Sequence, residues 1–154
     1  MNNTKKLQFY ILFLFLVGCG YTPVLLNQSY NISLNNINFN GDEEVNDNIL
    51  SSLNKSIKGG DQVYNLSIAS SKFKTTLTKD EKGDPNIFQM EIIADIIILD
   101  EKFEHIKEIT LSKKNTYNNI SDKFELDKFE EIMIQNLSRN ISNDILLKIN
   151  NLNR

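Results

Sequence analysis

One cysteine occurs in this chain, and the residues before it give its thiol a specific chemistry. Cys19 ends the tetrapeptide Leu-Val-Gly-Cys (residues 16–19), which closes an apolar run over residues 9–17 behind lysines at positions 5 and 6. A charged start and a short apolar run are typical of an export signal, and this run is far below the ~20 residues that span a bilayer. We therefore predict a lipoprotein signal that is cleaved before Cys19, whose sulfur becomes a thioether to diacylglycerol.

The other residue types that perform catalysis are scarce or poorly placed for it. The one histidine, His105, stands in a charged turn, where a solvated side chain is the expected role. Once Cys19 carries lipid, no Cys–His pair or zinc-binding spacing remains. Adjacent acids such as Glu43 and Glu44 lie next to each other on a predicted helix rather than on facing elements, so we expect them to be solvated, and the glycine pair at residues 59–60 ends a helix, which is the wrong end for anion binding. We expect no enzyme activity, no cofactor and no metal site.

Four lysines gather along one predicted strand and the turn that follows it. One interpretation is that they keep a strand that projects from the core in solution. The other is a binding site for an anionic amphiphile such as a phosphorylated glycolipid, because ammonium groups beside exposed Phe73 and Leu77 can contact a phosphate and an acyl chain together. The four candidates are Lys72, Lys74, Lys79 and Lys82.

The length and charge of the chain limit the number of domains and the kinds of partner that the mature protein can have. Of the 154 residues we assign 1–18 to a signal peptide that is removed, 19–30 to a lipidated tether and 31–154 to a single α+β domain. The remaining 136 residues are enough for one substantial core, which must supply the stability because no internal disulfide is possible. Loss of the two leader lysines changes the formal charge from −3 to −5, so we expect a membrane attached through acyl chains and no nucleic acid partner.

Two segments have helical periodicity. Residues 43–58 place apolar side chains at steps of three and four after Asp42, a residue type that caps helix N-termini, and the glycines at 59–60 follow as a stop. Residues 122–152 carry a longer stripe with the same spacing. We predict an amphipathic helix for each segment.

Four segments alternate apolar and polar residues as β-strands do, and this alternation is irregular in two of them. The first slips in phase at residues 35–36, which predicts a bulge or two short pieces, and the second changes parity at residues 70–71, where it either bulges or runs out past the core. The third segment is long and apolar enough to be a central strand. The fourth carries lysines, which on an edge strand hinder pairing with another chain. The segments are 32–39, 62–78, 87–99 and 109–117.

The order of these elements, β-α-β-β-β-α, predicts an α+β two-layer sandwich. Each amphipathic helix needs an apolar surface to bury against, so the two helices are expected on one face of a mainly antiparallel four-stranded sheet. Turns over residues 79–86 and 100–105 join the last three strands.

The start of the mature chain, Cys-Gly-Tyr-Thr-Pro at residues 19–23, together with the lipobox, the length and the element order, resembles LptE, the lipopolysaccharide-assembly lipoprotein family, in its short alphaproteobacterial form. The resemblance spans nearly the whole chain, while its motif is specific only over those five residues. It implies a non-enzymatic, lipid-anchored protein on the periplasmic side of the outer membrane. Such a protein plugs the LptD β-barrel translocon, assists its assembly and contacts lipopolysaccharide.

A second class of protein shares the same features. Another small outer-membrane lipoprotein, for example a scaffold subunit of the β-barrel insertion machinery, would also have a lipobox and an α+β domain. We further predict that the hairpin around residues 79–86 enters the barrel partner. The reason is that the parity change turns Phe73 and Leu77 away from the face that Leu66 and Ile68 bury, and exposed apolar surfaces mark binding sites.

Overall fold

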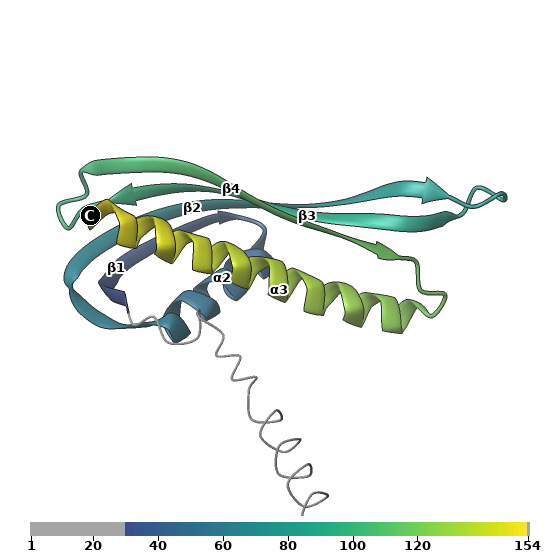
Figure 1. Ribbon diagram of the computed structural model, residues 1–154, viewed down its shortest axis with the longest axis horizontal. Coiled ribbons are helices and arrows are strands. Elements are labelled where there is room, and N and C mark those ends of the chain that lie inside the picture. The colour runs from purple at the N-terminus through teal and green to yellow at the C-terminus, as the bar shows by residue number, and fades with distance from the viewer. Residues whose placement is uncertain (1–29, 154) are drawn as a thin grey trace, which may run out of the picture.

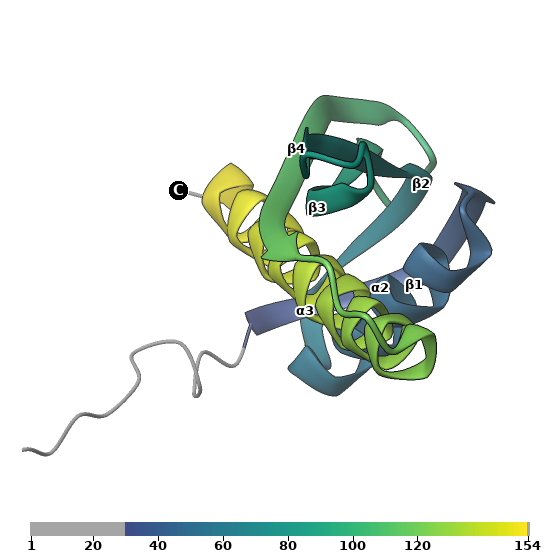
Figure 2. The same cartoon turned by 90° about the vertical axis from the view of Figure 1, so that its right-hand side faces the viewer.

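The computed structural model describes residues 30–153, which form two layers (Figure 1). One layer is a four-stranded sheet, and the other is a pair of helices that cover one face of it (Figure 2). This is the predicted α+β two-layer sandwich. The predicted signal peptide and most of the tether lie outside the described residues. In chain order the elements are β1 (Tyr30–Gly41), α2 (Glu43–Ser56), β2 (Ile57–Lys79), β3 (Pro85–Leu99), β4 (His105–Asn118), α3 (Lys123–Asn150) and the short 3-10 helix η2 (Asn151–Asn153).

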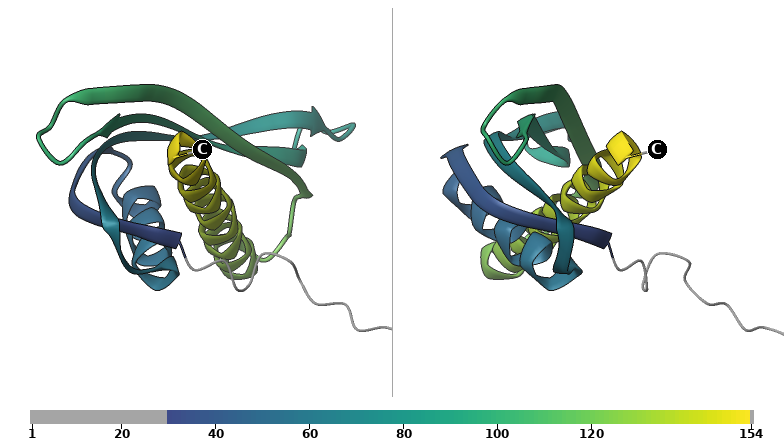
Figure 3. Two further views of the ribbon diagram at one scale, coloured as in Figure 1. Left: turned by 60° about the vertical axis from the view of Figure 1, so that its left-hand side comes forward. Right: turned by 90° about the vertical axis from the view of Figure 1, so that its left-hand side faces the viewer.

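The strands lie in the order β1-β2-β3-β4, and the sheet is twisted, with α3 running across it (Figure 3). β1 runs parallel to β2, with α2 as the connection between them, while β2, β3 and β4 are successively antiparallel. The prediction of a mainly antiparallel sheet with a central β3 and an edge β4 is therefore confirmed. The register between β1 and β2 shifts between Leu34 and Asn36, which confirms the predicted bulge.

Helix α2 begins where the sequence predicts and ends earlier. The Asp42 carboxylate accepts a hydrogen bond from the N–H of Val45 at 3.0 Å, as an N-cap does. The helix stops at Ser56, because Ile57 already has extended backbone and pairs with β1. The glycine pair at residues 59–60 is consequently not a helix stop but part of β2, which starts five residues before the predicted strand.

Strand β2 keeps its parity through residues 70–71, so the prediction of a bulge there is wrong and the alternative, a strand that runs past the core, is correct. Its pairing with β3 is continuous from Asn65 to Thr76, and the register shifts only at residues 76–79. Alternate residues on the helix side of the sheet are buried up to Ser70, and Lys72 and Lys74 continue the same face. The apolar series stops because at this point the helices present carboxylates rather than apolar side chains.

The core lies between the inner face of the sheet and the facing sides of the two helices. Every second residue of β3 from Phe88 to Ile98 is buried, as predicted for the central strand. In α3 the buried stripe begins at Met133, whereas Phe129, which belongs to the predicted stripe, is 42% exposed because the first part of the helix extends beyond the core. The fully buried large side chains are Ile32, Ile49, Leu53, Leu66, Ile68, Ile92, Ile96, Ile98, Ile141, Ile145, Leu146 and Ile149.

A small polar cluster fixes the junction between β1 and α2 against the middle of β2. Gly41, at φ +94°, brings the backbone so close to β2 that the N–H of Asp42 donates to the Ser70 carbonyl oxygen at 3.1 Å. The Ser70 hydroxyl lies 2.7 Å from Asn46 Oδ1, and the Asn46 amide donates to the Asn40 carbonyl at 3.2 Å. This contact orients the start of α2 relative to the sheet.

Candidate functional site

The structure divides the four candidate lysines into two pairs. Lys72 and Lys74 lie on the helix side of β2, and Lys79 and Lys82 lie exposed at the far end of the β2–β3 hairpin. Phe73 and Leu77, which are 51% and 47% exposed, do not form a patch with Lys72 and Lys74. Phe73 faces the opposite side of the sheet, because successive residues of a strand alternate between faces. The four lysines and two apolar residues therefore do not form one continuous patch.

The inner pair of lysines is held by carboxylates from both helices. Lys72 Nζ lies 2.5 Å from Glu44 Oε2 and 3.5 Å from Asp42 Oδ2 at the start of α2. Lys74 Nζ lies 2.5 Å from Glu130 Oε1 of α3 and 4.5 Å from the centre of the Phe88 ring. Each lysine thus links β2 to one helix, so its charge is already matched within the chain.

The Glu130 carboxylate, which forms the ion pair with Lys74, also accepts a hydrogen bond from Tyr117 of the edge strand β4. The hydroxyl of Tyr117 donates to Glu130 Oε1 at 2.7 Å, and its ring packs between Phe88 and Phe129 at centroid distances of 5.6 and 5.7 Å. Burial and the hydrogen bond to Glu130 both raise the pKa of Tyr117 well above its usual value. At Lys72, partial burial lowers the pKa, but the hydrogen bond to Glu44 and the charges of Glu44 and Asp42 outweigh it and leave the pKa raised.

A cleft of about 310 Å³ opens between these ion pairs and the first half of α3. Met90 and Ile134 form its apolar part, and Lys72 and Lys74 contribute its only positive charges. The carboxylates on its wall outnumber the lysines two to one, so the cleft has the wrong charge for a phosphate group. These carboxylates are Glu44, Asp127, Glu130 and Glu131.

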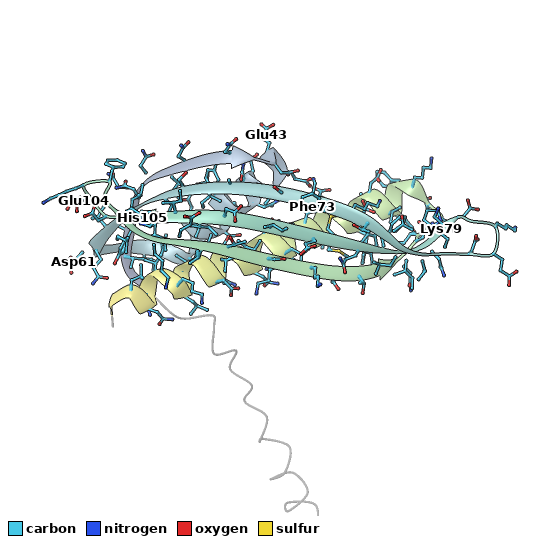
Figure 4. The ribbon with its side chains drawn as sticks, turned by 90° about the horizontal axis from the view of Figure 1, so that it is seen from above. Glu43, Asp61, Phe73, Lys79, Glu104 and His105 are labelled. Carbon is cyan, nitrogen blue, oxygen red and sulfur yellow. The ribbon has the colours of Figure 1, made fainter. Side chains whose placement is uncertain are left out.

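The outer pair of lysines belongs to a segment that we call the distal hairpin (residues 73–87). Every residue of β2 from Phe73 to Lys79 is exposed, and so is the turn that follows. Figure 4 shows Lys79 at one end of the sheet, with Glu104 and His105 at the other. Lys79 and Lys82 have no partner within hydrogen-bonding distance of their ammonium groups among the described residues, so they are available to an external anion.

The two turns of the sheet repeat one sequence and one geometry. Residues 80–84 read Asp-Glu-Lys-Gly-Asp, and residues 100–104 read Asp-Glu-Lys-Phe-Glu. In each turn the first aspartate accepts hydrogen bonds from the N–H groups two and four residues later, at 2.8 to 2.9 Å. The fourth position has a positive φ in both turns, +90° at Gly83 and +64° at Phe103.

Phe103 is therefore a strained residue, and sequence reasoning missed it. A side chain in the left-handed region costs about 1 to 2 kcal/mol relative to its usual conformation, and glycine avoids that cost. The ring gains little in return, because Phe103 is 57% exposed. The repeated tripeptide Asp-Glu-Lys at residues 80–82 and 100–102 is the signal that could have revealed the position.

The described residues offer little else that could perform chemistry. His105 is exposed at the start of β4, in agreement with its predicted solvated role. Within residues 30–153 no group of three or more histidines, cysteines or carboxylates is arranged to hold a metal ion. In the same part of the chain, none of the helices combines the length and the apolar character that crossing a membrane requires.

Comparison with known proteins relates this chain to bacterial lipoproteins through its fold. No protein-family model matches the sequence, and no curated protein matches it either. Among solved structures, rare lipoprotein B from Shewanella oneidensis superposes with a TM-score of 0.58 at 11% identity, over 77% of this chain and 96% of that one. A lipoprotein B from Nitrosomonas europaea gives 0.56 at 12% identity, over 88% and 93% of the two chains.

A minor lipoprotein from Acinetobacter baumannii is similar to the same degree, with a TM-score of 0.55 at 11% identity over 77% of this chain and 92% of that one. Each of these lipoproteins is covered almost completely, so the likeness concerns the whole domain and not a shared fragment. At such low identity the likeness establishes the fold alone. It supports an LptE-type lipoprotein fold for the described residues.

Proposed function

We propose that this protein is a lipid-anchored lipoprotein of the outer membrane that acts as the plug and assembly partner of an LptD-like β-barrel in lipopolysaccharide transport. The observation that carries the proposal is the fold, which matches solved bacterial lipoproteins over nine-tenths of their length or more. The lipobox that ends at Cys19 supports the anchor, and the motif at residues 19–23 supports the LptE type. In this role the protein binds the barrel and assists its assembly, and it catalyses no reaction.

The distal hairpin is the part of the molecule that best suits insertion into a barrel. β4 pairs with β3 up to Ile87, so only residues 78–86 project as a two-stranded arm, while the β2 side chains from Phe73 to Lys79 are exposed on both faces of the sheet. The distal hairpin carries Phe73 and Leu77 for apolar contacts, and Lys79 and Lys82 near its tip for phosphate groups of lipopolysaccharide. The ion pairs of Lys72 and Lys74 fix the base of the arm to the helices, so the arm is presented in one direction.

Capture of the partner tests the proposal. We expect that affinity purification of the full lipoprotein from detergent-solubilised membranes recovers one large β-barrel protein. A photo-crosslinking amino acid at residue 83 should label that protein or lipopolysaccharide, whereas one at Gln135, on the exposed side of α3, should label the barrel weakly. Strong labelling from Gln135 with none from residue 83 would reverse the proposed orientation. Recovery of the multi-subunit β-barrel insertion machinery instead would favour a scaffold subunit.

A charge exchange tests the role of the outer lysines separately. Glutamate at both Lys79 and Lys82 should leave folding intact, since both side chains are exposed, and should weaken capture of lipopolysaccharide. Glutamate at both Lys102 and Lys107 is the matched control, because these lysines are equally exposed at the opposite end of the sheet. Equal capture by the two double variants would show that the tip lysines are only solubilising.

The anchor itself has an independent test. Cys19→Ala removes the only possible acylation site, so we expect the precursor to keep residues 1–18 or to leave the membrane fraction. Mass spectrometry of the wild-type protein should find a diacylglycerol thioether on an N-terminal Cys19. A free thiol on a chain that retains residues 1–18 would contradict the lipoprotein assignment.

A further inference from the structure

The sheet has an open edge part of the way along β2, because β1 ends well before β2 does. The pairing of β1 with β2 stops at Gly41 and Ser70, where the chain turns into α2. Figure 4 shows β1 ending near Glu43, while the strand beside it continues toward Lys79. Over residues 71–79, which we call the open edge, β2 pairs with β3 on one side, and no strand of the described chain pairs with its other side.

The position of Ser70 indicates which backbone groups face the open edge. Its carbonyl oxygen accepts a hydrogen bond from the N–H of Asp42 at 3.1 Å, so it points to the β1 side of β2. The ladder with β3 is regular from residue 65 to residue 76, and in such a ladder both polar groups of a residue point to the same side, which alternates along the strand. The residues that point their N–H and C=O groups to the open edge are therefore Lys72, Lys74 and Thr76.

Lysines on an edge strand usually hinder pairing with another chain, but two of those at the open edge are held by the helices. Lys72 Nζ lies 2.5 Å from Glu44 Oε2, and Lys74 Nζ lies 2.5 Å from Glu130 Oε1. These ion pairs match both charges and keep both side chains on the helix side of the sheet. The residues that separate and follow these lysines are mostly phenylalanine and threonine, which favour strands. The open edge is thus suited to a further strand.

The two faces of the sheet beside the open edge indicate which strand would fit. On the face without helices, Phe73 is 51% exposed and offers an apolar contact. On the helix side lies the cleft of about 310 Å³ that Lys72 and Lys74 help to line. Two of its carboxylates, Asp127 and Glu131, form no ion pair with any described residue. Because successive side chains of a strand point to opposite faces, a segment that alternates apolar and basic residues would complement both faces.

We propose that the open edge accepts an extended segment of the barrel partner as an additional strand beside β2, with basic side chains directed to the cleft. This inference rests on the proposed function. The wall of a closed barrel cannot supply the segment, because its strands are already paired with one another, whereas a loop or an end of the chain inside the barrel has unpaired backbone groups. Main-chain hydrogen bonds give such a contact its affinity, and the side chains give it specificity. The open edge overlaps the distal hairpin, so both contact the same partner.

Hydrogen exchange of single backbone amides tests the strand addition directly. In the lipoprotein purified alone, the amides of Lys72, Lys74 and Thr76 should exchange rapidly, whereas those of Phe73 and Thr75 are protected by their bonds to β3. In the complex captured with the barrel, exchange at the first three should slow by about tenfold or more, and exchange at the other two should change little. The alternation between neighbouring residues distinguishes strand pairing from general shielding by a bound protein.

A proline at residue 76 tests whether the pairing contributes to capture. Thr76→Pro removes an N–H that points to the open edge and leaves the hydrogen bonds to β3 in place, so circular dichroism should find the domain folded. Thr76→Val is the matched control, because it keeps the N–H and the branched side chain. We expect Thr76→Pro to bind the barrel about tenfold more weakly than Thr76→Val, which corresponds to about 1.4 kcal/mol. Asp127→Asn combined with Glu131→Gln should also weaken binding, by removing the charges that a basic side chain would meet.

The alternative results separate this inference from the proposed function. A captured complex in which residues 72, 74 and 76 exchange as fast as in the lipoprotein alone would overturn the strand addition and leave the proposed function standing. Equal binding by the two folded variants at residue 76 would do the same, and if the proline variant unfolds, the exchange pattern of the unmodified protein decides. Failure of the unmodified protein to capture any barrel would refute the proposed function, and this inference with it. Slow exchange at residues 72, 74 and 76 that depends on the concentration of the purified lipoprotein would assign the edge to a second copy of the chain instead.

Discussion

Gly41 stands where the chain passes from β1 to α2, and replacing it with alanine tests the packing of that junction. A Cβ atom at this position would lie 2.0 Å from the carbonyl oxygen of Ser70, which is a backbone atom with no freedom to rotate away. An unstrained contact between carbon and oxygen needs about 3.3 Å. Gly41→Ala therefore forces β1 and β2 apart by more than an ångström at this point.

The expected loss follows from the contacts that such a shift breaks. The hydrogen bond from the N–H of Asp42 to the Ser70 carbonyl is lost, and so is that between the Ser70 hydroxyl and Asn46. Buried polar groups left without partners cost about 1 to 3 kcal/mol each. The positive φ adds about 1 kcal/mol for any residue with a Cβ. We expect a loss of about 3 to 5 kcal/mol, a large part of the 5 to 15 kcal/mol typical of a domain.

Gly83→Ala is the control, because it carries the same backbone strain without the collision. Gly83 has φ +90°, and no atom lies within 4 Å of the point that an alanine methyl group would occupy there. Urea unfolding followed by circular dichroism should therefore show a loss of only about 1 kcal/mol for Gly83→Ala. If the two variants lost equal stability, the close approach of Gly41 to Ser70 would not exist in solution, and the stated reason for the position of α2 would be wrong.

Three further outcomes are expected. Ile96→Asp places a charge in the core and should unfold the domain, whereas Lys113→Asp on the edge strand, which loses the ion pair with Asp144 at 2.7 Å, should cost about 1 to 2 kcal/mol and leave the domain folded; circular dichroism that finds both equally folded would contradict the assigned strand order. Because folding raises the pKa of Tyr117, its contribution to stability should be complete below about pH 10 and fall as the pH rises further; urea titrations of Tyr117→Phe should show a smaller fall, the remainder coming from groups such as Lys72 whose pKa is also raised, and an unchanged fall would rule out Tyr117 as a source. Phe103→Gly should raise, and Gly83→Phe lower, the free energy of unfolding by about 1 kcal/mol, and thermal melts with the same sign for both would refute the strain.

Much of the fold could be predicted because local chemistry and tertiary packing agree there. Asp42 and Asp122 cap their helices as their side chains favour, and the alternation of β3 matches its burial residue by residue. The end of α2 was not predictable in the same way. The glycines at residues 59–60 suggest a stop, but the pairing of Ile57 with Tyr30, a contact across 27 positions of sequence, ends the helix first.

The candidate site was harder to predict, because its geometry depends on contacts between distant segments. Lys72 and Lys74 look like solvated residues in the sequence, and only the folded helices bring Glu44 and Glu130 to them. Lys79 and Lys82 are exposed at the end of the hairpin, where a turn needs no long-range partner, and their predicted role in binding a ligand stays a prediction. The strain at Phe103 is a property of backbone conformation, which the sequence indicates only through the comparison of the repeated tripeptides at residues 80–82 and 100–102 and of the residues that follow them, Gly83 and Phe103.

The placement of the two hairpin turns at opposite ends of the strands has a mechanical consequence. If the tether is held by the membrane and the distal hairpin by a partner, any tension between them passes along the strand direction. The ladder between β1 and β2 is then loaded in shear, so its hydrogen bonds from Ile32 to Gly41 must fail together rather than one after another. Under the proposed function, the domain would therefore resist a pull between its N-terminal end and the distal hairpin without unravelling strand by strand.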